Sequence, residues 1–197
     1  ALIRRLPSVE TLGSTTVICS DKTGTLTHNE MTVKKIFVDD QIIDVAGSGY
    51  STTGQFSTSP QNFNLLLEIG VLCNDSKVEN KNCIGDPTEG SLLVSAQKAK
   101  IDTGTLRQDH PRLNEIPFSS ERKRMTTLHD IGGHYFATMK GAPEVILDRC
   151  SSYNSDGRIT PLTQERKEKI LNVNLGFSKD ALRVIGFAVK RLKGPQQ

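Results

Sequence analysis

The residues most suited to taking part in a chemical reaction lie where an apolar stretch, residues 15–20, ends at Asp21. The stretch is rich in β-branched side chains, which is typical of a strand buried in a parallel sheet. It predicts a strand that buries Cys19. In open α/β sheets, functional groups gather just beyond the carboxyl ends of the strands. Asp21 has such a position, and a carboxylate there can act as a nucleophile that accepts a phosphoryl group.

The residues that follow Asp21 are of types that assist phosphoryl transfer, a reaction that depends on positioning and on neutralisation of charge. Lys22 can offset negative charge, and Thr23 and Thr25 supply hydroxyl groups. Gly24 lets backbone N–H groups approach phosphate oxygens closely. For Asp21 considered alone, the alternative is an ordinary polar turn, because Asp is a common turn residue.

A second set of residues, spread over four later stretches, suits a purine nucleotide. An aromatic side chain can stack on the base, which contributes about 1–3 kcal/mol per base in nucleic-acid complexes. Lysine and arginine neutralise phosphates, an acid can accept a hydrogen bond from an exocyclic amine, and a glycine lets a ring approach the backbone. The set comprises Asp86, Glu89, Phe118, Lys123, Lys140, Gly141 and Arg183.

Each of these residues also has a structural explanation that involves no ligand. Phe118 can be a core aromatic, and the cations at 122–124 can form a solvated turn. Lys140 can be a surface charge at a strand end, and Arg183 can make an internal salt bridge. Glu89 lies where the capping-box partner of the following helix is expected. No single residue therefore decides between a binding site and an ordinary surface.

Composition and charge narrow the class of protein. Hydrophobic residues make up 36% of the chain, enough for a soluble core, and the net charge of +3 gives no indication of a nucleic-acid partner. No apolar run approaches the roughly 18 residues that a membrane span needs. The first residues lack the apolar region of a signal peptide. The four cysteines and four histidines have no metal-binding spacing, so reduced thiols and non-ligand histidines are expected.

Periodicity and turn residues predict short elements that mix strands and helices. Residues 74–81 and 101–112 are polar and are predicted to be irregular. Asp86 is a plausible helix N-cap, with proline following at the first helical position. Helices are expected at 7–12, 62–73, 88–99, 143–150 and 163–174, and strands at 36–38, 42–45, 113–118, 125–129, 135–139 and 181–189.

The string Asp21-Lys22-Thr23-Gly24-Thr25-Leu26-Thr27 resembles the phosphorylation motif of the P-type ion-pumping ATPases. The resemblance implies that Asp21 is the phosphorylated residue, that Asp21 and Thr23 contact Mg²⁺, and that this segment is related to the haloacid dehalogenase-like fold. Many phosphatases of that fold carry a second Asp two places after the nucleophile, where this chain has Thr23. The absence of that acid/base would slow hydrolysis of a phosphoenzyme, as a pump requires.

The four later stretches, in their order, resemble the nucleotide-binding domain of the same family, and most closely its calcium-pump-like class. The resemblance implies that Phe118 stacks on adenine and that Lys140 and Gly141 line the adenine pocket. It also implies that Glu89 faces the adenine and that the phosphates are met by Lys123 and Arg183. Asp86 and Met125 would make secondary contacts. The implied ligands are ATP or ADP with Mg²⁺.

The resemblance implies an α+β fold: a twisted antiparallel sheet flanked by helices, preceded by a short α/β haloacid dehalogenase-like remnant. The expected organisation is a truncated phosphorylation-domain segment at 1–29, a hinge at 30–35, the nucleotide-binding domain at 36–190 and a tail at 191–197. The family's later magnesium loop, actuator domain and membrane helices have no counterpart in the sequence. The chain is therefore expected to be a cytoplasmic fragment of an integral membrane protein.

The expected function of the parent protein is ATP-driven cation transport through an aspartyl phosphate, with calcium suggested by resemblance alone. The chain itself is expected to bind ATP weakly, to hold adenine more firmly than the phosphates and to be inactive in catalysis alone. Its other partners would be the remaining domains of the pump, with no nucleic acid. Two alternatives remain open: a haloacid dehalogenase-like phosphatase fragment with a cap, and a non-catalytic interaction module.

Overall fold

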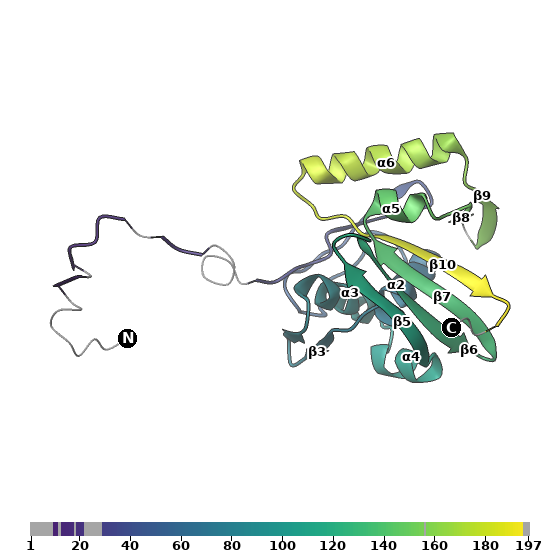
Figure 1. The fold of residues 1–197 in the computed structure, drawn as a ribbon, viewed down its shortest axis with the longest axis horizontal. Helices are drawn as coiled ribbons and strands as arrows, with labels where there is room; N and C mark the ends of the chain where they lie inside the picture. Colours follow the sequence, from purple (N-terminus) through teal and green to yellow (C-terminus); the bar gives the residue numbers. More distant parts are fainter. Residues whose placement is uncertain (1–9, 12, 18, 22–28, 156, 195–197) are drawn as a thin grey trace. The chain divides into compact units, whose positions relative to one another are not determined.

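The computed structural model describes the chain except residues 1–9, 12, 18, 22–28, 156 and 195–197. Contacts between residues divide the chain into two units, Ala1–Glu30 and Met31–Gln197. The second unit contains all the strands and long helices described below (Figure 1). It is a mixed α/β unit in which every strand pairing is antiparallel, and this agrees with the predicted fold class.

The N-terminal unit differs from the sequence-based expectation. Glu10, Thr11 and Gly13 have helical conformation, but the described residues between 15 and 20 form no strand and are exposed. Cys19 is exposed, so the prediction that a strand buries it is wrong. A strand of a parallel sheet requires hydrogen-bonded neighbours, and no described strand pairs with this segment. The α/β remnant stays a prediction.

The main sheet has four antiparallel strands in the order β10-β7-β6-β5. These are β5 (Arg112–Ser119), β6 (Arg124–Ile131), β7 (His134–Gly141) and β10 (Gly186–Leu192). Gly132 and Gly133 join β6 to β7 with φ values of +60° and +82°, as a two-residue hairpin turn requires. The predicted hairpin is confirmed. The last strand was predicted to begin at Ala181 but begins at Gly186, because Gly186 is the first residue to pair with β7.

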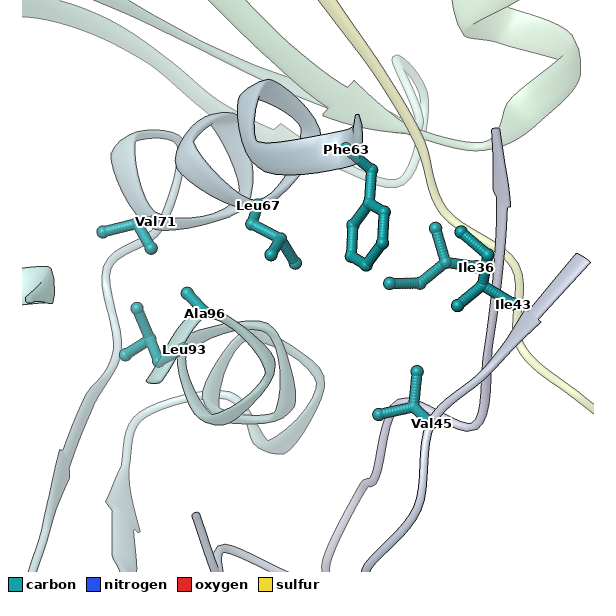
Figure 2. Packing of buried hydrophobic residues seen from close by; sticks show 8 residues of the cluster. All are labelled: Ile36, Ile43, Val45, Phe63, Leu67, Val71, Leu93 and Ala96. Carbon is teal, nitrogen blue, oxygen red and sulfur yellow. The ribbon is translucent and has the colours of Figure 1, made fainter. Parts of the chain in front are cut away.

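The apolar core lies between a small hairpin and two helices. The hairpin joins β1 (Lys35–Val38) to β2 (Gln41–Asp44), and the helices are α2 (Asn64–Leu72), preceded by a 3-10 turn at Pro60–Phe63, and α3 (Pro87–Lys98). Their inward side chains meet in one cluster (Figure 2). The cluster comprises Ile36, Ile43, Val45, Phe63, Leu67, Val71, Leu93 and Ala96. Helix α2 also contacts β7 and β10, so it connects this core to the main sheet.

Several short elements were not predicted. Residues 74–84 contain a hairpin of β3 (Lys77–Glu79) and β4 (Asn82–Ile84), whose turn places Asn80 and Lys81 at positive φ. The segment predicted to be irregular at 101–112 forms α4 (Thr103–Asp109), because the Asp102 carboxylate caps its first turn. A further hairpin pairs β8 (Ser152–Ser155) with β9 (Arg158–Pro161).

Two helices complete the second unit. Helix α5 (Pro143–Leu147) contacts β7 and β10 near one end of the sheet, and α6 (Gln164–Lys179) contacts α5 (Figure 1). Only Phe177 of α6 is buried. Ion pairs of Arg166 and Lys169 with Asp40 connect α6 to the turn between β1 and β2. Among the described residues, no helix is long and apolar enough to cross a membrane.

Candidate functional site

The end of the main sheet where β5 and β7 finish carries several of the predicted binding residues. Ser119 pairs with Arg124, Arg124 with Gly141, and Gly141 with Gly186, so one row of residues crosses all four strands. In the next row Lys140 pairs with both Met125 and Phe187. Side chains of directly paired residues point to the same face of a sheet. Lys140 and Met125 are therefore neighbours.

Phe118 lies at a break in the strand register. Ile116 pairs with Thr126 and Ser119 with Arg124, so Pro117 and Phe118 together face a single residue of β6. Such a bulge re-aims side chains and is frequent beside functional sites. Phe118 is 60% exposed, which excludes the alternative that it is a core aromatic. The sheet end thus presents an aromatic ring to solvent.

Lys140 forms an ion pair with Glu89, which lies on α3 and is 51 residues away in sequence. The Lys140 side chain is 9% exposed and that of Glu89 is 15% exposed, so Lys140 is not a surface charge. Burying two charges is costly unless both are paired and hydrogen-bonded. The pair joins α3 to the sheet in the row next to the one that contains Gly141.

The other oxygen of the Glu89 carboxylate is held by the turn after α2. Its Oε2 accepts hydrogen bonds from the backbone N–H groups of Asp75, at 2.8 Å, and Ser76, at 3.0 Å. The Ser76 hydroxyl also donates to Oε2, at 3.2 Å. These partners belong to another segment of the chain and not to the N-cap of α3. The capping-box explanation of Glu89 is therefore wrong.

Asp86 acts as the N-cap of α3, as the sequence predicted. Its Oδ1 accepts from the backbone N–H groups of Thr88, at 2.7 Å, and Glu89, at 3.2 Å. Burial opposes ionisation of Asp86, but hydrogen bonds from Thr88 and Glu89 outweigh it and lower the pKa of the carboxyl group. This capping role explains Asp86 without a ligand.

Arg183 precedes β10 and is exposed. Its Nη1 donates to the Thr88 hydroxyl at the start of α3, at 3.1 Å. Within the part of the chain that the structure describes, Arg183 forms no ion pair, so the internal salt bridge considered from the sequence is not found. The guanidinium group therefore lies at the same end of α3 as Asp86 and Glu89.

The turn between β5 and β6 concentrates positive charge. Lys123 is exposed and has a φ of +52°, and its carbonyl accepts from the Ala142 N–H at 3.0 Å. Burial lowers the pKa of Arg124, and the nearby guanidinium groups of Arg149 and Arg122 lower it further. Arg149 was not singled out from the sequence, because it belongs to a different segment.

Gly141 is required by the fold itself. A Cβ atom at this position would lie 2.4 Å from the Lys123 carbonyl oxygen and 2.7 Å from the Arg124 Cβ. The close approach involves the neighbouring strand and not a ligand. Met125 is 1% exposed, so it lies beneath the surface beside Lys140. Both residues support the site from inside the sheet.

The predicted phosphorylation motif belongs to the N-terminal unit. Asp21 is described and exposed, whereas Lys22, Thr23, Gly24 and Thr25 lie outside the described residues. Among the described residues, no group of three or more His, Cys, Asp or Glu side chains could hold a metal ion. Thr23 lies outside the described residues, so the Mg²⁺ contact expected at Asp21 and Thr23 stays a prediction.

An open depression of about 450 Å³ lies elsewhere in the second unit. Its lining residues come from the β1–β2 hairpin and the loop that follows it, and they include Lys34, Lys35, Asp44 and Phe56. None of the predicted binding residues lines it. It is a separate feature of the surface.

Comparison with known proteins identifies the chain's relatives. A family model described as "P-type ATPase, cytoplasmic domain N" matches residues 62–197. The chain is 44% identical over 191 residues to "Calcium-transporting ATPase 1" of Lactococcus lactis, covering 96% of this chain and 21% of that protein.

Two further relatives come from other organisms. "Calcium-transporting ATPase 1" of Bacillus cereus is 42% identical over 190 residues, covering 96% of this chain and 20% of that protein. Human "Calcium-transporting ATPase type 2C member 1" is 38% identical over 203 residues, covering 95% of this chain and 22% of that protein. The chain thus spans about a fifth of the length of the curated relatives it matches. The chain belongs to the P-type ATPase family, and residues 62–197 match its cytoplasmic domain N.

Proposed function

We propose that this chain is the nucleotide-binding portion of an ATP-driven cation pump, located in the cytoplasm as part of an integral membrane protein. The observation that carries the proposal is the exposed Phe118 ring at the sheet end that also holds the buried Glu89–Lys140 pair. Adenine stacks on Phe118 and lies beside Lys140 and Gly141, with Glu89 on the adenine side. Lys123 and Arg183 neutralise the phosphates.

The proposal extends to the parent protein through the names of the relatives, which are calcium-transporting ATPases. We propose that Asp21 accepts the γ-phosphoryl group of ATP in the complete pump and that calcium is the transported ion. Mg²⁺ accompanies the nucleotide and neutralises phosphate charge in such a transfer. Because the chain spans about a fifth of the length of these relatives, we propose that it binds ATP and that hydrolysis needs the remaining domains of the pump.

An NMR titration of the 197-residue chain with ATP, with and without Mg²⁺, tests the binding proposal. We expect saturable shifts at Glu89, Phe118, Lys140 and Arg183, and Phe118→Ala should weaken binding. Ile116→Ala is the matched control, because Ile116 lies on the same strand and is 53% exposed but has no assigned contact with the base.

Two results would overturn the assignment of the pocket. One is the absence of saturable shifts at millimolar ATP. The other is a set of shifts confined to Asp21 and its neighbours. An equal loss of affinity in Phe118→Ala and Ile116→Ala would show that the strand, and not the aromatic ring, determines binding.

A further inference from the structure

The turn at residues 73–76, which follows α2, contacts the Glu89–Lys140 pair from inside the protein. Asn74 in this turn is 1% exposed and uses its whole carboxamide. Its Nδ2 donates to the Gly70 carbonyl, at 3.0 Å, and to the Glu89 carbonyl, at 2.9 Å. Its Oδ1 accepts from the Ser76 N–H at 3.0 Å. Asn74 therefore sets the shape of the turn and fastens it to α3.

The turn then orients the Glu89 side chain. The Asp75 N–H donates to Glu89 Oε2, and Lys140 donates to Oε1. The Ser76 N–H is shared between Oε2 and Asn74 Oδ1, and the Ser76 hydroxyl is shared between Oε2 and the Asp86 carbonyl. A carboxylate has about four lone-pair sites. Because both oxygens of Glu89 accept from groups that the fold holds, the carboxylate orientation is determined by the protein, and so is the position of the Lys140 ammonium group.

An arginine on α4 binds carbonyl groups of the turn and of the end of α2. The Arg107 guanidinium group donates to the carbonyls of Val71, at 3.3 Å, Asn74, at 3.0 Å, and Ser76, at 3.3 Å. Positive charge is favourable at a helix C-terminus, and Val71 belongs to the last turn of α2. The planar guanidinium group has several N–H donors and can bind three carbonyl groups at once, whereas the compact ammonium group of lysine is less suited to this geometry.

We propose that Asn74, Ser76 and Arg107 are positioning residues that fix Glu89, and through it Lys140, before a nucleotide arrives. A binding group that is already held in place loses less conformational freedom when the ligand binds. The inference rests on the proposed function for the identity of the ligand. The positioning itself is a property of the ligand-free protein and can be measured without nucleotide.

The test is Arg107→Met in the full chain, followed by two measurements. The first is the ¹⁵Nζ resonance of Lys140 in the ligand-free protein, which reports the Glu89–Lys140 contact directly. We expect this resonance to shift or broaden. The second is the ATP dissociation constant, which should rise by about threefold or more, as for residues coupled within one hydrogen-bond network.

Two further variants should show smaller effects, because each removes only some of the interactions. Arg107→Lys retains the positive charge but not the planar guanidinium group, so its ATP affinity should lie between those of the wild type and Arg107→Met. Ser76→Ala removes the hydroxyl contacts with Glu89 and with the Asp86 carbonyl and keeps both backbone bonds to Glu89, so it should shift the Lys140 resonance in the same direction by less. Ser76→Ala also keeps the test possible if Arg107→Met does not fold.

The matched control is Arg166→Met, because Arg166 forms an ion pair with Asp40 and lies over the Tyr153 ring, with no contact to the turn. It should lower stability and leave the Lys140 resonance and the ATP affinity unchanged. The proposal is overturned if Arg107→Met leaves both unchanged, or if Arg166→Met alters them equally. A shifted Lys140 resonance in a chain that binds no ATP would support the positioning and refute the nucleotide function.

Discussion

Glu89 on α3 and Lys140 on β7 form an ion pair that is 51 residues apart in sequence and largely shielded from solvent. The pair connects two elements that meet only in the folded protein. Its energy depends on both partners, because either charge left alone in a buried position must be desolvated without compensation. This dependence makes the pair the most informative target for measurements of stability.

Lys140→Met should lower the free energy of unfolding by about 2–4 kcal/mol, because it leaves the Glu89 carboxylate buried without its cation. Lys169→Met is the matched control, since Lys169 is 50% exposed in its ion pair with Asp40 and such pairs contribute about 0–1 kcal/mol. Urea denaturation at pH 7 measures both. Equal and small losses would show that the Glu89–Lys140 pair contributes no more than a surface pair.

Phe118→Ala should change the free energy of unfolding by no more than about 0.5 kcal/mol, the usual range for exposed positions. The reason is that Phe118 is 60% exposed and lies in a bulge. Phe63→Ala, at a position 2% exposed in the core, should cost about 3–5 kcal/mol. Thermal or urea unfolding of the two variants compares them directly. A large loss of stability in Phe118→Ala would restore the explanation that it is a core residue.

Gly141→Ala should destabilise the protein by about 2 kcal/mol or more, because the new Cβ would overlap the Lys123 carbonyl and force the strands apart. Gly176→Ala provides the opposite case, since Gly176 lies within α6 and a Cβ there meets nothing within 4 Å. That variant should gain about 0.5–1 kcal/mol from helix propensity. Denaturant unfolding, with the same dependence of the free energy on denaturant concentration in all proteins, would show a lower midpoint for Gly141→Ala and a higher midpoint for Gly176→Ala. An unchanged midpoint for Gly141→Ala would contradict the close approach.

His129 predicts a pH dependence of stability. It is 2% exposed, its Nδ1 donates to the His110 carbonyl at 2.9 Å, and its Nε2 accepts from the Thr127 hydroxyl at 2.9 Å. Burial lowers the pKa of His129, although the hydrogen bond to the His110 carbonyl opposes the shift. The folded protein therefore favours the neutral ring.

The unfolded chain binds the His129 proton near its ordinary pKa of about 6.5, above the folded value. Stability from His129 is fully present above that pH, and as pH falls below it, stability is lost by at most about 1.4 kcal/mol per unit. Measurement of unfolding between pH 7.5 and 5 in the wild type and in His129→Gln isolates the effect. A pH slope that is identical in the two proteins would contradict it.

The sequence by itself determined the features that depend on nearby residues. Asp86 and Pro87 predicted the start of α3, and the side chain caps that helix as expected. Gly132 and Gly133 predicted the hairpin of β6 and β7. The residue types at Phe118, Lys140 and Arg183 suit a nucleotide, but they lie in separate segments, and the binding surface stays a prediction. Helix caps and hairpin turns depend on residues that are close together in the sequence, so the sequence alone predicts them.

Only the tertiary structure decided which distant groups meet. Glu89 looked like a capping-box partner, but its carboxylate is bound by Ser76 and Lys140 from other segments. The apolar stretch around Cys19 looked like a buried strand, yet its described residues are exposed and none of the described strands pairs with them. A strand exists only with a neighbour, and a buried charge only with a partner. Both conditions depend on contacts across the chain that residue type and spacing do not specify.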